Sequence, residues 1–561
     1  MSGGADEEGQ SAGDRPRSRP LPGLLSMIAG LSGWRRHVLS FFAGAGTAAA
    51  LAPFYVWPLL AVGFGVLFIL ISEERPGGPE QTSRKDPKRV RRAAIDGWWF
   101  GFGYFLLGIY WLGFSFLVQA DQFAWMAPFA VLGMPAFLAV FFALPAAIAT
   151  AVQVEAWRRA VLFAALISVF EYLRGHILTG FPWNLTGQAF AGLAATSQTA
   201  ALWGAYGLSF LTLLIAFAPV ATLRWRARPW AGGAFAAFLV ATLSVYGILR
   251  IEAIGEQSRD GVVVRVVQPN IAQREKIDPS RRADNFYRHI DLSLPEDKSA
   301  PAVVVIWPEN ATPFLHEARD ALSVLAARLP ANATLLAGTV RLGLDGEGEE
   351  RAFNSFAAID DINGAREAVA TYDKHHLAPF GEYLPMRSVL RAVGLAQLAP
   401  FEQGFKAGPG PRTISLANAE GSSLPTGAKA HPIPPFAPLI CYETVFPGRL
   451  YPRGDRPEWL VTVTNDAWFG DSSGPRQHLD QSRLRTIETG LPMARSANTG
   501  ISAIIDARGV YVARAQLYSK AALEAPLPQA LAPTLYARFG DLFYFVMVFS
   551  AVGVSFFAVR K

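Results

Sequence analysis

Six stretches of the sequence are long enough to cross a lipid bilayer and contain no Asp, Glu, Lys or Arg. A membrane-spanning helix needs about 20 predominantly apolar residues, whereas apolar runs of about 10 to 14 residues are more typical of a buried core helix. Because 51% of the chain is hydrophobic as well, we place it in a membrane class. The stretches are residues 54–72, 97–120, 123–154, 201–223, 229–249 and 542–559.

Two further stretches resemble spans less closely. Residues 38–52 are rich in Gly and Ala, and their Ala-rich end could also pass for a signal-peptidase site. Residues 160–178 are interrupted by Glu171 and Arg174, whose spacing lets them pair near a membrane interface. With both included, we predict eight spans.

The basic residues form short clusters on every second connection between the predicted spans. Such clusters stay in the cytoplasm, so both termini are predicted to be cytoplasmic and the large segment before the last span lies on the other side. The net charge is +6, but there is no long basic patch with interleaved aromatic residues, which argues against nucleic-acid binding. The clusters are Arg35 and Arg36, residues 84–92, Arg158 and Arg159, residues 224–228, and Arg560 and Lys561.

The predicted organisation is a disordered cytoplasmic tail at 1–33, a transmembrane bundle of seven spans at 34–250, an outer domain at 251–535 and a C-terminal span at 540–561. In the outer domain, short β-branched or apolar runs alternate with helix-like stretches, which predicts a layered α/β domain. The expected strands are 261–268, 302–307, 334–339, 354–359, 436–440, 460–463 and 501–506, the expected helices include 316–328 and 478–489, and 415–435 is an expected loop insertion.

Three residues of the outer domain could carry chemistry. Glu309 follows an apolar run, and a carboxylate at the end of a buried strand can have a pKa high enough for a general base. Cys441 is the only cysteine, so it cannot form an intramolecular disulfide, and it directly follows residues 436–440. Taken singly, Glu309 could be a capping residue, Lys374 a solvated cation and Cys441 a small buried side chain. Together they supply a base, a cation and a nucleophile for acyl transfer.

Longer motifs surround these residues. Trp-Pro-Glu at 307–309, Tyr-Asp-Lys-His-His-Leu-Ala-Pro-Phe-Gly-Glu-Tyr at 372–383 and Cys-Tyr-Glu at 441–443 resemble the signatures of the nitrilase superfamily. From about residue 37 to the C-terminus the chain resembles the membrane branch of that superfamily, the apolipoprotein N-acyltransferases. The motifs that extend this resemblance are Glu-Tyr-Leu-Arg-Gly at 171–175, Thr-Gly-Phe-Pro-Trp-Asn at 179–184, Thr-Asn-Asp-Ala-Trp-Phe-Gly at 464–470 and Ala-Arg-Ser-Ala-Asn-Thr-Gly-Ile-Ser at 494–502.

The resemblance implies an αββα sandwich on an eight-helix membrane base, in a bacterial inner membrane with the catalytic domain on the periplasmic side. It implies that a phospholipid, commonly phosphatidylethanolamine, donates an acyl chain, and that the α-amine of a lipoprotein's N-terminal diacylglyceryl-cysteine accepts it. No metal or cofactor is implied. The implied roles are general base for Glu309, stabiliser of the intermediate for Lys374, nucleophile for Cys441, and supporting positions for Glu382, Tyr442 and Glu443.

The sequence departs from the family pattern at two positions. Pro269 stands where Gly is usual, which fixes the local backbone, and Ile277 stands where a substrate-lining Trp is usual. A third feature is the segment 384–400, whose apolar residues and two arginines fall on different faces of a helix. It could be a structural helix or a lid that dips into the outer leaflet.

Three other functions fit parts of the sequence. The spans alone could belong to a transporter or a scaffold, although only Glu171 and Arg174 form an intramembrane charge pair. A membrane-anchored amidase could use the same three residues with water as the acceptor. A non-catalytic lipid-binding protein could retain the fold without the chemistry. Lipid-dependent acylation of Cys441 would distinguish the acyltransferase from all three.

Overall fold

The computed structural model describes ten segments of the chain, and each structural statement below concerns these residues. Most of the segment 384–400 and of the expected loop insertion at 415–435 lies outside them, as do the basic residues at 84, 85, 224, 226, 560 and 561. The described segments are residues 23–72, 86–223, 228–255, 258–296, 302–346, 348–362, 364–385, 404–418, 433–448 and 450–557.

A helix is present at each of the eight predicted spans, but only part of this bundle meets the length and composition expected of a membrane crossing. Three described helical segments do so, namely Ala120–Ala151, Ala200–Ala221 and Ala231–Ile254. The count of eight spans therefore stays a prediction. The bundle helices are α2 (Trp34–Ala48), α3 (Pro58–Ser72), α4 (Pro87–Ile109), α7 (Ala127–Leu138), α8 (Val140–Ala151), α9 (Ala156–His176), α11 (Ala200–Ala221), α12 (Ala231–Ile254) and α19 (Leu542–Phe556).

Two helices in the N-terminal part extend beyond the predicted spans. Residues Gly23–Gly30 form helix α1, within the tail predicted at 1–33. Helix α4 begins at Pro87, before the predicted span at 97–120, because the Asp86 side chain caps it and proline is favourable in the first turn. The described part of the basic cluster, residues 88–92, is therefore helical.

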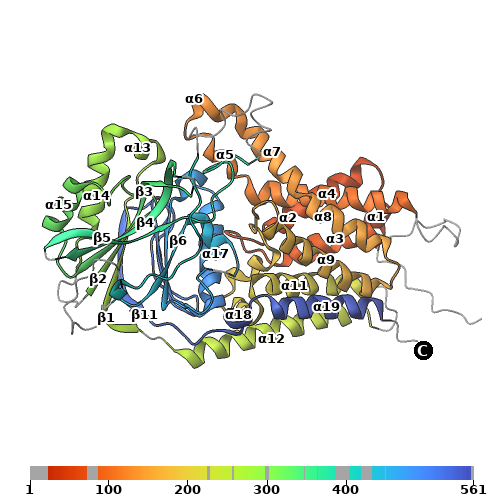
Figure 1. Cartoon of the computed structure of the whole chain (residues 1–561). Helices are drawn as coiled ribbons and strands as arrows, with labels where there is room; N and C mark the ends of the chain where they lie inside the picture. Colours follow the sequence, from red (N-terminus) through yellow and green to blue (C-terminus); the bar gives the residue numbers. More distant parts are fainter. Residues whose placement is uncertain are drawn as a thin grey trace, which may run out of the picture.

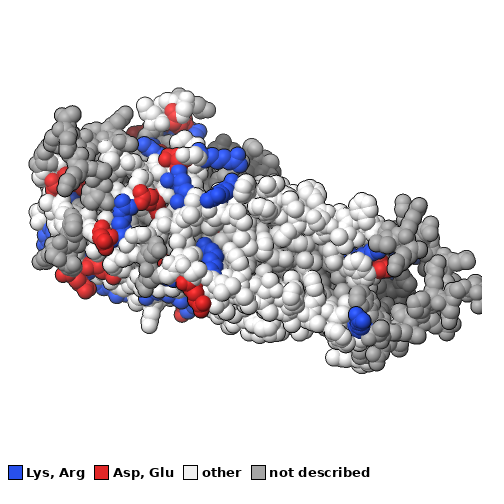
Figure 2. All heavy atoms as spheres, turned by 90° about the horizontal axis from the view of Figure 1, so that it is seen from below, with Lys and Arg blue, Asp and Glu red and all other residues white. Residues whose placement is uncertain are grey.

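The surface of the bundle carries very little charge. Figure 2 shows a broad uncharged zone between the charged outer domain and a few charged residues at the far end of the bundle. Large apolar side chains are exposed across this zone, which is the surface expected of helices in contact with lipid. Examples are Phe129, Phe137, Phe235, Phe238, Val546 and Phe549.

The outer domain contains two mixed β-sheets. All seven predicted strands are present, but β5, β8, β10 and β11 were not predicted. Charged residues interrupt β5 and β8, and β10 and β11 contain few β-branched residues. The first sheet has the order β11-β1-β2-β3-β4-β5 and the second β10-β9-β8-β7-β6. Their strands are β1 (Ser258–Gln268), β2 (Ala302–Trp307), β3 (Ala333–Leu344), β4 (Glu350–Ile362), β5 (Ala365–Asp373), β6 (Phe436–Ile440), β7 (Trp459–Thr464), β8 (Met493–Ala497), β9 (Ala503–Ile505), β10 (Tyr511–Arg514) and β11 (Ala521–Pro528).

The two sheets pack face to face between helical layers (Figure 1). One apolar core joins the sheets and includes Val304, Phe356, Ile440 and Val461. A second core covers the other face of the first sheet, under α14 (Arg282–Ser293) and α15 (Arg319–Arg328). Helix α17 (Gly474–Thr489) covers the second sheet, which completes the predicted αββα arrangement.

Helix α17 lies between the second sheet and the bundle, and nearly all of its side chains are buried (Figure 1). Its polar side chains bond to the bundle. Gln477 accepts from the indole of Trp183 at 2.7 Å, Asp480 accepts from the hydroxyl of Tyr55 at 2.6 Å, and Glu488 accepts from the backbone N–H of Ala205 at 2.8 Å. These bonds fix the sandwich on the membrane base through buried polar contacts.

Candidate active site

The three candidate residues each follow the end of a strand. Glu309 comes two residues after β2, Lys374 directly after β5 and Cys441 directly after β6. Cys441 begins a short 3₁₀ helix, Cys441–Val445, with a φ of 51°. A non-glycine residue in the left-handed region costs roughly 1–3 kcal/mol and is common where a site must present a side chain. The sharp turn from strand to helix thus determines the position of the thiol.

A buried network of charges links Glu309, Lys374 and Glu382. The Lys374 ammonium lies 2.8 Å from Glu382 Oε2 and 3.6 Å from Glu309 Oε1. Both carboxylates also accept hydrogen bonds from the side-chain amide of Asn354, at 2.7 Å for Glu309 and 2.6 Å for Glu382. Lys374 is only 1% exposed. Burial alone would lower its pKa, but Glu382, Glu309 and Cys441 outweigh burial and raise it, so the ammonium stays charged.

The electrostatics of the Cys441 thiol follow from this network. Burial and the nearby charge of Glu309 raise the pKa of Cys441, whereas Lys374 lowers it. The net shift is upward, so the resting side chain is a thiol and needs a base to remove its proton. Glu309 is the carboxylate whose charge acts most strongly on the thiol, and Lys374 is the cation that favours the thiolate. The arrangement can therefore generate the nucleophile at the moment of attack.

Glu443 connects the chain segments around Cys441. Glu443 accepts from the hydroxyl of Tyr372 at 2.8 Å and from the backbone N–H groups of His375 at 2.9 Å and Ile440 at 2.7 Å. Although burial opposes ionisation, His375 and these N–H groups lower the pKa of Glu443, so its carboxylate ties the strand before Cys441 to the segment after Lys374.

The bundle contributes a loop to the rim of the site. The hydroxyl of Tyr442 donates to the carbonyl of Gly180 at 3.0 Å, and the hydroxyl of Tyr383 donates to Thr179 Oγ1 at 3.1 Å. A ring nitrogen of His376 lies 2.8 Å from the carbonyl of Thr179. The Thr-Gly-Phe-Pro-Trp-Asn motif of the membrane half therefore contacts Tyr442, directly after Cys441, and His376 and Tyr383, which follow Lys374 in the chain.

A second polar cluster, formed by Asp466, His478 and Arg495, contacts the backbone of Cys441. Asp466 is 2.8 Å from His478 Nδ1 and 2.9 Å from Arg495, and His478 Nε2 lies 3.2 Å from the carbonyl oxygen of Cys441. Cys441, Asp466 and His478 offer three atoms within 4.8 Å of one another, which is the spacing of a metal site. The Arg495 guanidinium already supplies the positive charge that Asp466 requires, so we interpret this cluster as a support for the Cys441 turn.

Two residues near the site were not found from the sequence. Asn354 is a buried amide in the middle of β4, and Lys276 donates to the backbone carbonyl of Glu309 at 2.6 Å. Burial lowers the pKa of Lys276 to about 8, against the opposing effects of Glu309 and Cys441. Asn354 lies in a strand that contains both polar and apolar residues, so the strand sequence does not indicate its role. Lys276 stands among other charged residues, which likewise give no indication.

Comparison with known proteins relates both halves of the chain to one family. The profile of the apolipoprotein N-acyltransferase N-terminal domain matches residues 43–218, and that of carbon-nitrogen hydrolase matches residues 263–534. Proteins named apolipoprotein N-acyltransferase from Rhodopseudomonas palustris and Bradyrhizobium diazoefficiens are 39% and 40% identical to the chain. Each alignment covers 93% of this chain, and 95% and 94% of the two relatives, respectively. The chain belongs to the apolipoprotein N-acyltransferase family. A relative of the same name from Brucella melitensis is 39% identical over 91% of the chain and 94% of its own length.

As a member of the apolipoprotein N-acyltransferase family, the chain is an acyltransferase with a carbon-nitrogen hydrolase domain. The two positions at which we expect departures from the family pattern, Pro269 and Ile277, lie in one segment. Pro269 follows β1 and precedes Asn270, whose backbone N–H donates to the carbonyl of Asn498 at 3.1 Å. Ile277 ends helix α13 (Gln273–Ile277), directly after Lys276, and is 44% exposed. The segment that carries both departures therefore reaches Glu309 through Lys276.

Proposed function

We propose that the chain transfers a fatty acyl group from a phospholipid, through a thioester on Cys441, to the α-amino group of the N-terminal diacylglyceryl-cysteine of an apolipoprotein. The observation that carries this proposal is the charge cluster at Cys441, in which a half-buried thiol interacts with both Glu309 and Lys374. The apolar bundle beneath it favours substrates that reside in a bilayer.

In the first half-reaction, Glu309 accepts the thiol proton and Sγ attacks the ester carbonyl of the phospholipid. Lys374 stabilises the negative oxygen of the tetrahedral intermediate. The attack forms a carbon–sulfur bond. The ester carbon–oxygen bond then breaks, which leaves the thioester, and Glu309 returns the proton to the departing lysophospholipid.

In the second half-reaction, the acceptor amine attacks the thioester carbonyl. A carbon–nitrogen bond forms, the carbon–sulfur bond breaks, and the amine proton passes through Glu309 to the thiolate. Glu382 and Asn354 hold Lys374 and Glu309 in position, as their hydrogen bonds indicate. Glu443 and Tyr442 hold the turn at Cys441, so we assign them supporting roles.

The same proposal includes a placement in the membrane. The bundle at 34–250 and the helix at 540–561 lie in a bacterial inner membrane, the domain at 251–535 lies on the periplasmic side, and both termini are cytoplasmic. The one-sided basic clusters support this orientation.

The experiment is a mass measurement of the peptide that contains Cys441. Purified full-length protein mixed with phosphatidylethanolamine of one acyl composition should gain one acyl mass on that peptide, and hydroxylamine should remove it. Cys441→Ser should show neither the adduct nor transfer, because an alkoxide is much harder to form than a thiolate. Glu309→Gln should also block the adduct, whereas Glu317→Gln, which changes a half-exposed carboxylate after the same strand, should not.

The alternative function, hydrolysis of small amides, predicts a different pattern. An amidase would turn over a soluble amide and would form no lipid-derived thioester. Normal acyl transfer by Cys441→Ser would refute the proposed nucleophile.

A further inference from the structure

Helix α13 directs a lysine toward the proposed general base. Lys276 is half-buried, and its ammonium donates to the backbone carbonyl of Glu309 at 2.6 Å. Most lysine side chains keep their charged end in water, because removing an ammonium group from water costs free energy. An ammonium that bonds to the backbone of Glu309 therefore requires an explanation other than surface charge.

Buried amide side chains hold α13 against the second sheet. Asn465, which follows β7, donates to the side-chain oxygen of Gln273 at 2.7 Å. Asn498, which follows β8, accepts from the backbone N–H of Ile271 at 3.0 Å and donates to its carbonyl at 2.7 Å. Both asparagines are buried, and buried amides are costly to leave without a partner, so these contacts fix the start of α13. The fold thereby sets the position from which Lys276 reaches Glu309.

The turn that contains Glu309 lies beyond the end of β2. Asn310 adopts a left-handed φ of 48°, and the backbone N–H of Ala311 donates to the carbonyl of Gly338 in β3 at 2.9 Å. The bond from Lys276 acts one residue earlier, on the peptide that follows Glu309 itself. A hydrogen bond from a charged donor is roughly twice as strong as one between neutral groups. The charge of Lys276 therefore strengthens the contact that holds the backbone of Glu309.

The charge of Lys276 changes within an accessible pH range. Burial lowers the pKa of Lys276 to about 8, although Glu309 and Cys441 act to raise it. The ring of His289 in α14 is close enough to sense this charge, and burial lowers the pKa of His289 to about 3, so the imidazole is neutral. The ammonium is thus charged at pH 7 and loses its proton as the pH rises past about 8. The carboxylates that flank Lys276 in the chain are exposed, namely Glu275 and Asp278.

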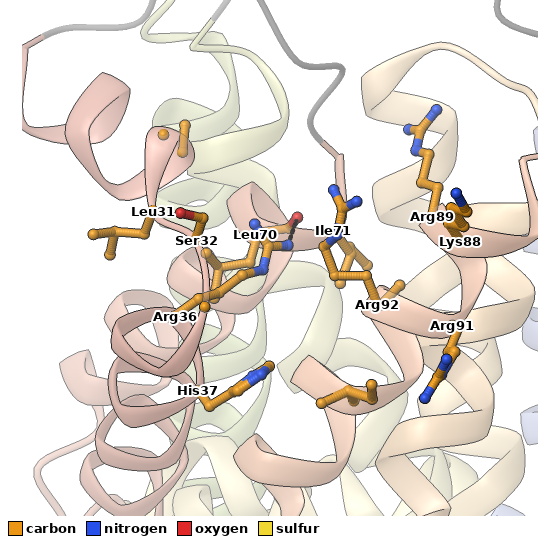
Figure 3. A pocket seen from close by; sticks show the side chains of 15 residues that line it. Leu31, Ser32, Arg36, His37, Leu70, Ile71, Lys88, Arg89, Arg91 and Arg92 are labelled. Carbon is orange, nitrogen blue, oxygen red and sulfur yellow. Dashed lines mark hydrogen bonds between the residues drawn. The ribbon is translucent and has the colours of Figure 1, made fainter.

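The cations that line a pocket at the far end of the bundle do not share this arrangement. Figure 3 shows Lys88, Arg91 and Arg92 pointing in different directions, and Figure 1 shows that the start of α4 lies far from the β-sheets. Those side chains do not converge on one group, whereas the ammonium of Lys276 is directed at Glu309.

We propose that Lys276 is a positioning residue for Glu309, whose backbone its ammonium holds so that the carboxylate meets the thiol of Cys441. No bond forms to Lys276 during the reaction, and no proton leaves it. The inference rests on the proposed function, because it concerns the transfer of the thiol proton to Glu309.

The test measures acylation of Cys441 in the purified full-length protein at pH 7, with phosphatidylethanolamine of one acyl composition. Lys276→Met retains a long side chain but removes its charge and its N–H groups. It should lower the maximal rate about 10- to 100-fold, because a small displacement of the base slows the reaction. The lipid concentration at half of the maximal rate should change less than about twofold, since Lys276 acts on Glu309 and not on the lipid. Arg274→Met, which removes an exposed cation from the same helix, should keep both values.

The pH profile supplies a readout that a purely structural lysine would not change. The wild-type rate should fall above about pH 8, where Lys276 loses its proton. Lys276→Arg should keep most of the rate and extend it to about pH 10, because a guanidinium remains protonated there. Titration of the lipid headgroup is the same for both proteins, so the difference between their profiles reports on residue 276.

Alkylation of Cys441 by a small reagent shows whether each variant is folded. If Lys276→Met loses alkylation as well, Lys276→Arg decides, and either a wild-type pH profile or an inactive protein would overturn the proposal. Two results in a folded Lys276→Met would also overturn it: an unchanged maximal rate, or a higher half-saturating lipid concentration as the only change. Absence of the thioester from the wild type would instead refute the proposed function, and this inference with it.

Discussion

Asp466 lies in a completely buried group of charged and polar side chains beside the nucleophile. Burial would raise its pKa, but Arg495, His478 and Thr464 together lower the pKa of Asp466 to about 2. A carboxylate whose pKa is lower in the folded than in the unfolded protein stabilises the folded state. This stabilisation is complete above the pKa of the unfolded state, near 4, and it is lost as the pH falls toward the pKa of the folded state, about 2. The loss across this window is roughly 2 kcal/mol.

We therefore predict that Asp466→Asn removes this part of the acid sensitivity. Thermal unfolding in detergent, followed from pH 6 to pH 2, should show a smaller drop in midpoint below pH 4 for Asp466→Asn than for the wild type. The variant should also be less stable at neutral pH, because Arg495 is left buried without its partner. Asp471→Asn, at an exposed carboxylate, should keep the wild-type profile. If Asp466→Asn keeps that profile too, the assigned ion pair does not act on stability.

At the residue scale, the sequence singled out the residues proposed to perform the chemistry more readily than those proposed to support them. Glu309 and Cys441 could be identified because each follows an apolar run. Asn354 bonds to two carboxylates from distant parts of the chain, and these contacts arise only when the first sheet forms. Lys276 reaches Glu309 through tertiary packing. Contacts of this kind have no local sequence pattern.

At the scale of elements, strand β3 determines where Glu309 can lie. Gly338 is placed so that an added Cβ would come within 2.5 Å of Glu309 Cα and 2.6 Å of the carbonyl oxygen of Pro308. We predict that Gly338→Ala displaces the backbone at Glu309 and lowers acylation of Cys441 about 10- to 100-fold. Gly346→Ala is the matched control, since an added Cβ there meets no atom within 4 Å.

The measurement for Gly338→Ala compares two reactions of the same thiol. In the proposed mechanism, acylation by phospholipid requires Glu309, whereas slow alkylation by a small reagent requires mainly access to the sulfur. A selective loss of acylation fits a displaced base. Equal loss of both reactions would mean that the substitution disrupts the whole sandwich.

Among the elements, apolar strands and long apolar helices could be predicted, and strands with alternating or polar sequences could not. Strand β8 contains Arg495 and Ser496, which are both buried, so its sequence does not resemble a core strand. The predicted span at 97–120 covers only the charge-free part of α4, whereas the Asp86 cap and Pro87 extend the helix through the basic residues before it. In both cases tertiary pairing or capping outweighed local hydrophobicity.

At the scale of the whole molecule, the proposed orientation in the membrane rests on the basic clusters. We predict that a reporter fused after Arg226 is active only in the cytoplasm, and that one inserted near Thr426 is active only outside it. The enzymatic readout of each fusion in intact cells measures this. If both reporters fall on the same side, the predicted number of spans between them is wrong.

Helix α17 has a consequence for how such a protein can change over generations. Gln477 and Asp480 belong to the outer domain by sequence, yet they bond to Trp183 and Tyr55 of the membrane half. A recombination event that exchanged the outer domain between distant relatives would separate these partners and leave buried polar groups unsatisfied. Such an exchange should therefore destabilise the protein, although each half matches a different family profile.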